Sequence, residues 1–84
     1  MEISPIMKAR GNSDVIFLQA LGNRIAAMRK EKQITQSELG YRCDIEKQSI
    51  NRIEAGNTNP TILTLQKIAT ALEIPLEELL KAKG

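Results

Sequence analysis

The 84-residue sequence has no histidine, no tryptophan, one cysteine (Cys43) and only two aromatic residues, Phe17 and Tyr41. The lack of histidine and of a second thiol excludes a disulfide framework, a zinc site and histidine-based catalysis. Two aromatic side chains are too few for a platform that stacks single-stranded bases. No apolar run approaches the roughly 18 residues of a membrane span, and Met1–Arg10 lacks the apolar stretch of a signal peptide. We therefore expect a cytoplasmic protein that is not an enzyme and needs no cofactor or metal.

The remaining composition describes a small, mildly basic domain. Twelve basic against ten acidic residues give a net charge of +2, which is low for a general coat of nucleic acid. Any nucleic-acid contact must therefore depend on where the charges lie. The 42% hydrophobic content fits one domain with a small core. Cys43 suits a reducing compartment, either as a small buried hydrophobe or as a redox switch.

Two short amphipathic patterns joined by a tight break occupy Ile34–Glu54. The first opens with Thr35-Gln36-Ser37-Glu38, which has the spacing of a capping box. Leu39 and Cys43 follow four residues apart and so share one face. Asp44 then interrupts the pattern, and aspartate tolerates the left-handed conformation that such a break requires. These features predict a short helix that ends in a tight turn.

The second pattern predicts a helix from about Lys47 to Ala55, with Ile50 and Ile53 inward and Gly56 in position to stop it. Its outward side chains are of the kinds that hydrogen-bond base edges and phosphates. They are Lys47, Gln48, Ser49, Asn51 and Arg52.

The flanking sequence predicts three further helices and no strand. Pro5 and Gly11 make residues 1–12 a flexible arm, whose Lys8 and Arg10 either reach phosphates or are simply disordered. The other predicted segments are a helix from Ser13 or Asp14 to about Lys32, one capped by Thr61 that reaches about Leu72, a short one carrying Leu76, Leu79 and Leu80, and a frayed tail at 81–84. One domain at 13–80 follows from this pattern.

Between about Leu21 and Leu80 the chain resembles the phage-repressor helix-turn-helix family, also called the Cro type or xenobiotic-response-element type. The residues that carry the resemblance are Thr35-Gln36, Glu38-Leu39, Ile45, Ser49-Ile50, Arg52-Ile53-Glu54, Gly56, Asn59-Pro60 and the run Thr64-Leu65, Ile68-Ala69, Ala71-Leu72. The resemblance implies an all-α, compact five-helix lambda-repressor-like domain with the helix-turn-helix at its second and third helices.

The function that the resemblance implies is sequence-specific binding of double-stranded DNA by a transcriptional regulator, chiefly a repressor, of bacterial or phage type. The alternative is an antitoxin or a protein-interaction adaptor on the same scaffold, because fold alone does not fix function. No small-molecule ligand is evident.

Individual roles also follow from the resemblance. The third helix would enter the major groove, where Lys47 or Arg52 can pair with guanine and Gln48 with adenine. The full set of expected base or groove contacts is Lys47, Gln48, Ser49, Asn51 and Arg52, and the expected phosphate contacts are Thr35, Gln36, Asn57 and Thr58. Arg29 and Glu54 match positions that form an ion pair in the family. Arg24 is expected to face solvent or phosphate.

Three positions depart from the family pattern. Gly40 stands where alanine is usual, at a point where the second and third helices must approach closely. Asp44 replaces the glycine of the turn. Glu46 replaces the serine or threonine cap of the third helix, and it either caps that helix or accepts a hydrogen bond from a cytosine amino group.

A two-fold homodimer on a palindromic operator is also expected, because one such domain reads only a few base pairs. The predicted interface is an apolar stripe at the fifth helix, formed by Ile74, Leu76, Leu79 and Leu80. The competing surface is Val15–Leu18, four consecutive apolar residues that one helix face cannot bury.

Overall fold

A computed structural model describes residues 3–81, and the side chains of residues 13–81. Within that range the chain forms helices and no strand. The helices are α1 (Ile3–Glu31), α2 (Gln36–Cys43), α3 (Lys47–Glu54), α4 (Ile62–Leu72) and α5 (Leu76–Leu79). The predicted all-α, five-helix fold is therefore confirmed. None of the helices in the described part of the chain is long and apolar enough to cross a membrane.

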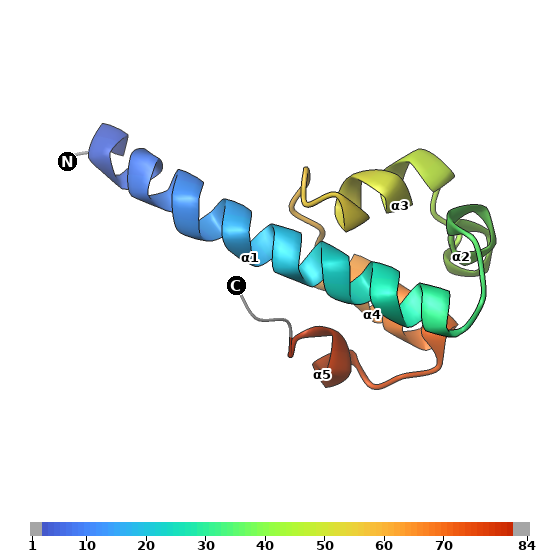
Figure 1. The fold of residues 1–84 in the computed structure, drawn as a ribbon. Coiled ribbons are helices and arrows are strands. Elements are labelled where there is room, and N and C mark those ends of the chain that lie inside the picture. Colours follow the sequence, from blue (N-terminus) through green and yellow to red (C-terminus); the bar gives the residue numbers. More distant parts are fainter. Residues whose placement is uncertain (1–2, 82–84) are drawn as a thin grey trace.

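The C-terminal half of α1 is the element around which the other helices are placed (Figure 1). It contacts α3 on one side and α5 on the other, while α2 packs against both α3 and α4. The N-terminal half of α1 projects beyond the other helices, which explains why the molecule extends 44 Å in one direction but only 23 and 19 Å in the others.

The predicted start of the first helix was wrong, because α1 begins at Ile3 and not at Ser13 or Asp14. Pro5 lies in the first turn, where its missing N–H would have no intrahelical partner in any case. Gly11 lies inside the helix, where glycine costs only about 1 kcal/mol. The side chains of Lys8 and Arg10 lie outside the described residues, and so does most of the predicted tail at 81–84.

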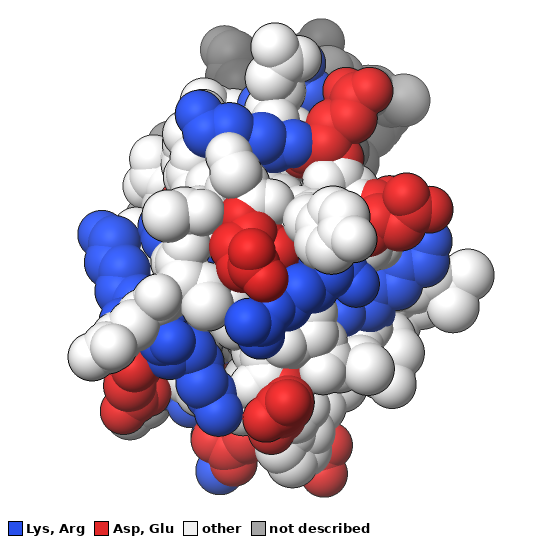
Figure 2. Space-filling view, turned by 90° about the vertical axis from the view of Figure 1, so that its right-hand side faces the viewer, with Lys and Arg blue, Asp and Glu red and all other residues white. Residues whose placement is uncertain are grey.

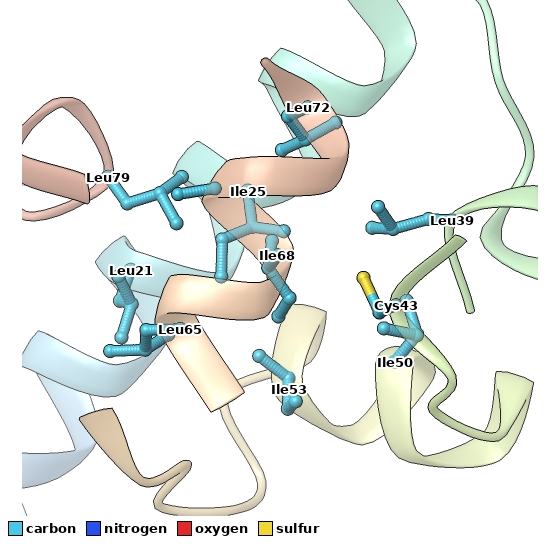
Figure 3. Close-up of a cluster of buried hydrophobic side chains, with 11 residues drawn as sticks. Leu21, Ile25, Leu39, Cys43, Ile50, Ile53, Leu65, Ile68, Leu72 and Leu79 are labelled. Carbon is cyan, nitrogen blue, oxygen red and sulfur yellow. The ribbon is translucent and has the colours of Figure 1, made fainter. Parts of the chain in front are cut away.

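The core lies where all five helices meet, α1 to α5 (Figure 3). Its fully buried large side chains are Ile25, Leu39, Ile50, Ile68, Leu72 and Leu79. Cys43 lies among them, and its Sγ is 3.7 Å from the carbonyl oxygen of Lys67. Burial raises the pKa of the Cys43 thiol above its usual value, which keeps the thiol neutral. Cys43 thus packs as a small buried hydrophobe, the first of the two alternatives considered for it.

Four helices end with a residue in the left-handed conformation, and only one of these residues is glycine. They are Gln33 (φ 61°), Asp44 (φ 60°), Gly56 (φ 76°) and Glu73 (φ 61°). Each non-glycine member is followed by an isoleucine that packs against the core: Ile34, Ile45 and Ile74. This apolar contact accompanies the Schellman motif, and it offsets the cost of a Cβ in the left-handed region. The predicted conformation of Asp44 is confirmed.

Candidate nucleic-acid interface

A side-chain cap fixes the start of α2, and a backbone hydrogen bond from the Ile45 N–H to the carbonyl oxygen of Gly40, at 2.8 Å, closes the turn between α2 and α3. The Thr35 hydroxyl accepts from the Glu38 N–H at 3.0 Å. The Glu38 carboxylate accepts from Arg42 Nε at 2.9 Å, so it does not complete the predicted capping box. A Cβ on Gly40 would lie 2.4 Å from the carbonyl oxygen of Ile45. A glycine at position 40 is therefore required by the backbone of the turn, and not by α3 itself.

The first turn of α3 has no side-chain cap. Glu46 occupies the N-cap position with extended backbone (φ −63°, ψ 145°), but its side chain makes no capping hydrogen bond. The exposed carboxylate stays beside the positive end of the helix, where a negative charge is locally favourable. Of the two roles considered for Glu46, capping by hydrogen bonding is not seen.

One face of α3 carries the polar residues that the sequence singled out. Ile50, Ile53 and Glu54 are buried, whereas Ser49 is half-buried. The exposed members of the polar set are Lys47, Gln48, Asn51 and Arg52. A helix whose inner face is fixed by the core presents these side chains on a rigid support, which a protein needs in order to read base edges in a groove.

A hollow of about 260 Å³ separates the C-terminal half of α3 from the loop that leads to α4. Ser49 and Arg52 line it from the helix, and Thr58 and Asn59 line it from the loop. The loop therefore stands beside the exposed face of α3, and the two predicted groups of contacts, on the helix and on the loop, adjoin one another.

The end of the molecule that carries α2 shows no concentration of one charge sign (Figure 2). Basic and acidic side chains are interspersed over this surface. The domain therefore offers no broad positive field on this face. A polyanion would have to be recognised through particular side chains, in keeping with the small net charge.

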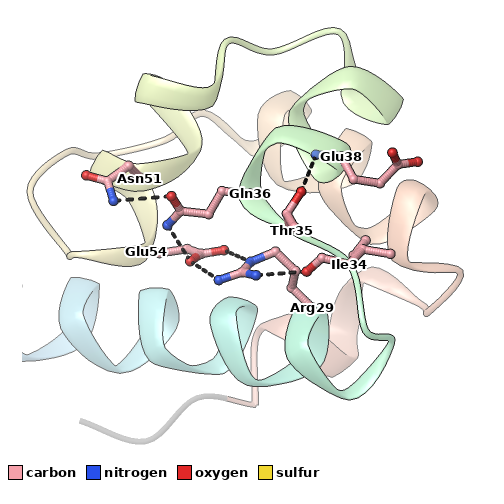
Figure 4. Close-up of polar contacts among 7 residues, drawn as sticks. All are labelled: Arg29, Ile34, Thr35, Gln36, Glu38, Asn51 and Glu54. Carbon is pink, nitrogen blue, oxygen red and sulfur yellow. Dashed lines mark hydrogen bonds and ion pairs between the residues drawn. The ribbon is translucent and has the colours of Figure 1, made fainter.

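A buried ion pair links α1 to the end of α3. Arg29 donates from Nε to Glu54 Oε2 at 2.7 Å and from Nη2 to Glu54 Oε1 at 3.0 Å. Its Nη1 donates to the carbonyl oxygen of Ile34 at 2.8 Å. The hydrogen bonds that Arg29 donates to Glu54 raise the pKa of the Arg29 guanidinium, against the opposing effect of burial. The pair expected from the family resemblance is thus present, at the distances of a bidentate contact (Figure 4).

The same carboxylate also accepts a hydrogen bond from one amide side chain of the predicted DNA-contact set, and a second amide bonds to the first (Figure 4). Gln36 Nε2 donates to Glu54 Oε1 at 2.9 Å, and Asn51 Nδ2 donates to Gln36 Oε1 at 3.4 Å. The sequence placed Gln36 at a phosphate and Asn51 in the groove but did not connect them. The three-residue spacing of Asn51 and Glu54 was the available signal, because such residues share a helix face.

Arg24 was expected to face solvent or phosphate, and this was wrong. Its Nε donates to the backbone carbonyl of Glu78 at 2.8 Å, and its Nη2 lies 3.2 Å from Glu78 Oε1. Arg24 therefore joins α1 to α5 on the side of the domain away from α3.

The predicted interface stripe needs a correction at Leu79, which is fully buried within its own chain. Ile74 and Leu76 are half-buried against the core, and only Leu80 is substantially exposed. In the competing segment of α1, Val15, Ile16 and Phe17 are each exposed by about half of their surface. The apolar face of α5 packs against the core of its own chain, so that face is not available to a partner subunit.

Comparison with known proteins places these features in a family. The family model described as Helix-turn-helix matches residues 25–79. The uncharacterized HTH-type transcriptional regulator y4dJ of Sinorhizobium fredii is 37% identical over 59 residues, which cover 70% of this chain and 77% of that protein. The HTH-type transcriptional repressor RghR of Bacillus subtilis is 32% identical over 68 residues, which cover 80% of this chain.

Among solved structures, the restriction-modification controller protein C.AhdI from Aeromonas hydrophila superimposes with a TM-score of 0.73. The two are 29% identical, and the match covers 74% of this chain and 90% of the controller protein. The chain spans only half the length of RghR.

Proposed function

This chain belongs to the helix-turn-helix family of DNA-binding transcriptional regulators, and we propose that it binds a specific double-stranded DNA site by placing α3 in the major groove. The observation that carries the proposal is the exposed polar face of α3, which is backed by the buried Ile50, Ile53 and Glu54. Members of this family are not enzymes. Repression is the mode that we propose, as in the relative RghR, and the cytoplasm is the proposed location because the DNA target would lie there.

Direct readout would come from the exposed face of α3. Lys47 or Arg52 can pair with guanine O6 and N7, and Gln48 can pair with adenine N6 and N7. Ser49 is half-buried beside the α3–α4 loop, so it would contact the edge of the groove. Each good base contact contributes roughly 1–3 kcal/mol of discrimination.

Phosphate contacts would flank that face on both sides. Thr35 and Gln36 lie at the N-terminus of α2, where backbone N–H groups favour an anion. Asn57 and Thr58 lie in the loop after α3, next to the hollow that Arg52 lines. Such contacts fix the register of the domain on the duplex, whereas base contacts specify the sequence.

Selection of bound sequences from a random duplex pool tests the proposal. The wild type should enrich one sequence, and Arg52→Ala should relax the preference at the base that Arg52 reads. Arg42→Ala is the matched control, because it removes the same charge from α2, where Arg42 pairs with Glu38. Asn57→Ala should weaken binding to all sequences alike. Equal loss on selected and random duplex for Arg52→Ala would contradict its assigned role.

The alternative function is protein interaction without DNA binding, as an antitoxin or adaptor. A mobility shift with random duplex at two salt concentrations separates the two functions. A DNA-binding domain should show weak binding that falls steeply as salt rises, because displaced counterions drive the association. A domain dedicated to protein interaction should show no shift at either salt concentration.

We further propose that the working unit is a homodimer on a palindromic operator. A closed two-fold pair uses the same patch on both subunits, and it would place two α3 helices about one turn of DNA apart. Within the two surfaces considered, the exposed apolar side chains are Val15, Ile16 and Phe17 on α1 and Leu80 at the end of α5. Ile74 and Leu76 could add only their partly exposed edges.

Sedimentation of single variants tests this interface. Phe17→Glu and Leu80→Glu should stay folded, become monomeric and lose cooperative operator binding. Leu63→Glu is the control, because Leu63 is a highly exposed leucine on α4. A wild type that remains monomeric at high concentration, and binds each half-site independently, would contradict the dimer.

A further inference from the structure

We propose that Glu54, acting through Gln36, fixes the orientation of the Asn51 side chain, and that Asn51 in this orientation reads an adenine in the major groove. Glu54 and Gln36 would then be positioning residues and Asn51 a specificity-determining residue. The inference rests on the proposed DNA-binding function and extends it to one base. Three hydrogen-bonded contacts form the chain, from Arg29 through Glu54 and Gln36 to Asn51 (Figure 4).

The starting point is a group that can only accept hydrogen bonds. Glu54 is buried and pairs with the Arg29 guanidinium through both carboxylate oxygens. An ionised carboxylate has no donor. The side-chain amide of Gln36 must therefore turn its NH₂ group toward Glu54, at 2.9 Å, and its oxygen away from it.

The orientation of the Gln36 amide in turn fixes the orientation of the exposed Asn51 amide. The Gln36 oxygen now faces Asn51, so Asn51 turns its own NH₂ group toward Gln36, at 3.4 Å. The two ends of an isolated amide are nearly interchangeable in shape. Here the buried carboxylate removes that ambiguity at both amides in turn, because each position has one arrangement in which donor meets acceptor.

The result is a fixed donor–acceptor edge on the exposed face of α3. Asn51 keeps one N–H and its oxygen free of the chain just described, and it is exposed between Lys47 and Arg52. An asparagine that offers one donor beside one acceptor matches N7 and the N6 amino group of adenine. Because the amide needs no rotation on binding, less conformational freedom is lost than at a mobile side chain such as Lys47.

The first test needs no DNA. In a ¹⁵N–¹H spectrum, Gln36→Met should shift the side-chain amide signals of Asn51, because methionine offers no oxygen to them. The side-chain amide of the exposed Gln66 on α4 should not move. Thermal unfolding confirms that the variant is folded. Unchanged Asn51 signals in folded Gln36→Met would overturn the orienting chain.

The second test uses selection from a random duplex pool. Asn51→Ala should lose a preference for adenine of about tenfold or more at one position. Gln36→Met should reduce the preference at that same position, beyond any uniform weakening from a lost phosphate contact. Gln48→Ala is the control and should relax a different position. The double variant of positions 36 and 51 should show no further loss of adenine preference over Asn51→Ala alone.

Two outcomes separate this inference from the proposed function. A wild type that selects a site, with Asn51→Ala weakening all sequences equally, would overturn adenine reading by Asn51 and leave DNA binding intact. A wild type that selects no sequence would overturn both, while the spectra would still report whether Gln36 orients Asn51.

Discussion

Among the described side chains, two arginine–glutamate pairs join α1 to other helices, and they differ mainly in burial. Arg29 and Glu54 tie α1 to α3 with side chains only 10% and 6% exposed. Arg24 and Glu78 tie α1 to α5 with side chains 33% and 35% exposed. The same kind of ion pair is therefore buried beneath the polar face of α3 in one case and accessible to solvent on the opposite side of α1 in the other.

Burial decides what each pair contributes. A buried pair costs much to desolvate, so its intact value is modest, but removing one partner leaves an uncompensated charge. An exposed pair is screened by water and salt and contributes little. We infer that the α3 side of α1 depends on its ion pair, whereas the α5 side depends on the burial of Leu79.

The largest effect is expected from Glu54→Ala. It leaves the Arg29 guanidinium buried without its carboxylate, so the free energy of unfolding should fall by about 3–5 kcal/mol. Urea unfolding followed by circular dichroism measures the change. Glu31→Ala is the control, because Glu31 is an exposed glutamate at the end of α1. Similar losses of unfolding free energy in the two variants would mean that the buried Arg29–Glu54 pair contributes no more to stability than an exposed glutamate does.

Leu79→Ala should cause the second-largest loss of stability, and it tests the packing of α5 against the rest of the domain. Leu79 is fully buried although α5 is only a single turn, and truncating a buried leucine costs about 2–5 kcal/mol. Leu80→Ala, at the exposed neighbouring position, should change the stability little. A small effect of Leu79→Ala on thermal unfolding would mean that the Arg24–Glu78 pair, and not the burial of Leu79, stabilises the packing of α5 against α1.

Gly22→Ala should weaken the α1–α3 tie without removing any charge. A Cβ at position 22 would lie 2.4 Å from the carbonyl oxygens of both Ile53 and Glu54. Since these are backbone atoms, α1 and α3 must move apart, at a cost of about 1–3 kcal/mol. The exposed Asn23 provides the control variant, Asn23→Ala. Gly22→Ala with wild-type stability in urea would show that the helices can separate without loss.

The sequence predicted one of these ties and missed the other for a physical reason. Arg29 and Glu54 fall at positions with a known family pairing, so the resemblance could identify them. Arg24 and Glu78 are 54 residues apart, and no helical period or motif connects them. Their contact depends on how α5 folds back beneath α1, which is decided by tertiary packing.

Dependence on tertiary packing also explains why the sequence did not predict which leucine of α5 is buried, or that Gln36 and Asn51 are linked to Glu54. A stripe of Leu76, Leu79 and Leu80 shows that one face is apolar, but a four-residue helix does not reveal which leucine reaches the core. The helix-turn-helix itself was predictable because its caps, turn residue and inward isoleucines are local signals. The link from Glu54 to Gln36 was not, because it spans two helices and depends on the precise angle between them.

The smallest effect is expected from Glu78→Gln, and pH sharpens it. The Glu78 carboxylate accepts from Lys81 Nζ at 2.9 Å and from Arg24 Nη2 at 3.2 Å, and Lys81 first, then Arg24, lower its pKa from the usual 4.5. A pKa lowered by folding contributes stability that is complete above the unfolded-state pKa and is lost as the pH falls through the folded-state value. Glu78→Gln keeps the backbone bond from Arg24 and should therefore destabilise the domain less than any variant above.

The difference in unfolding free energy between wild type and Glu78→Gln should be present near pH 7, and it should shrink in high salt. It should shrink as the pH falls below the unfolded-state pKa and vanish below the folded-state pKa, where the carboxylate is protonated in both states. Glu77→Gln, at the exposed neighbour on α5, is the control and should change the stability at pH 7 less than Glu78→Gln does. A difference that persisted unchanged at pH 3 and in high salt would mean that Glu78 acts through packing. It would contradict our description of Arg24–Glu78 as an exposed ion pair that water and salt screen.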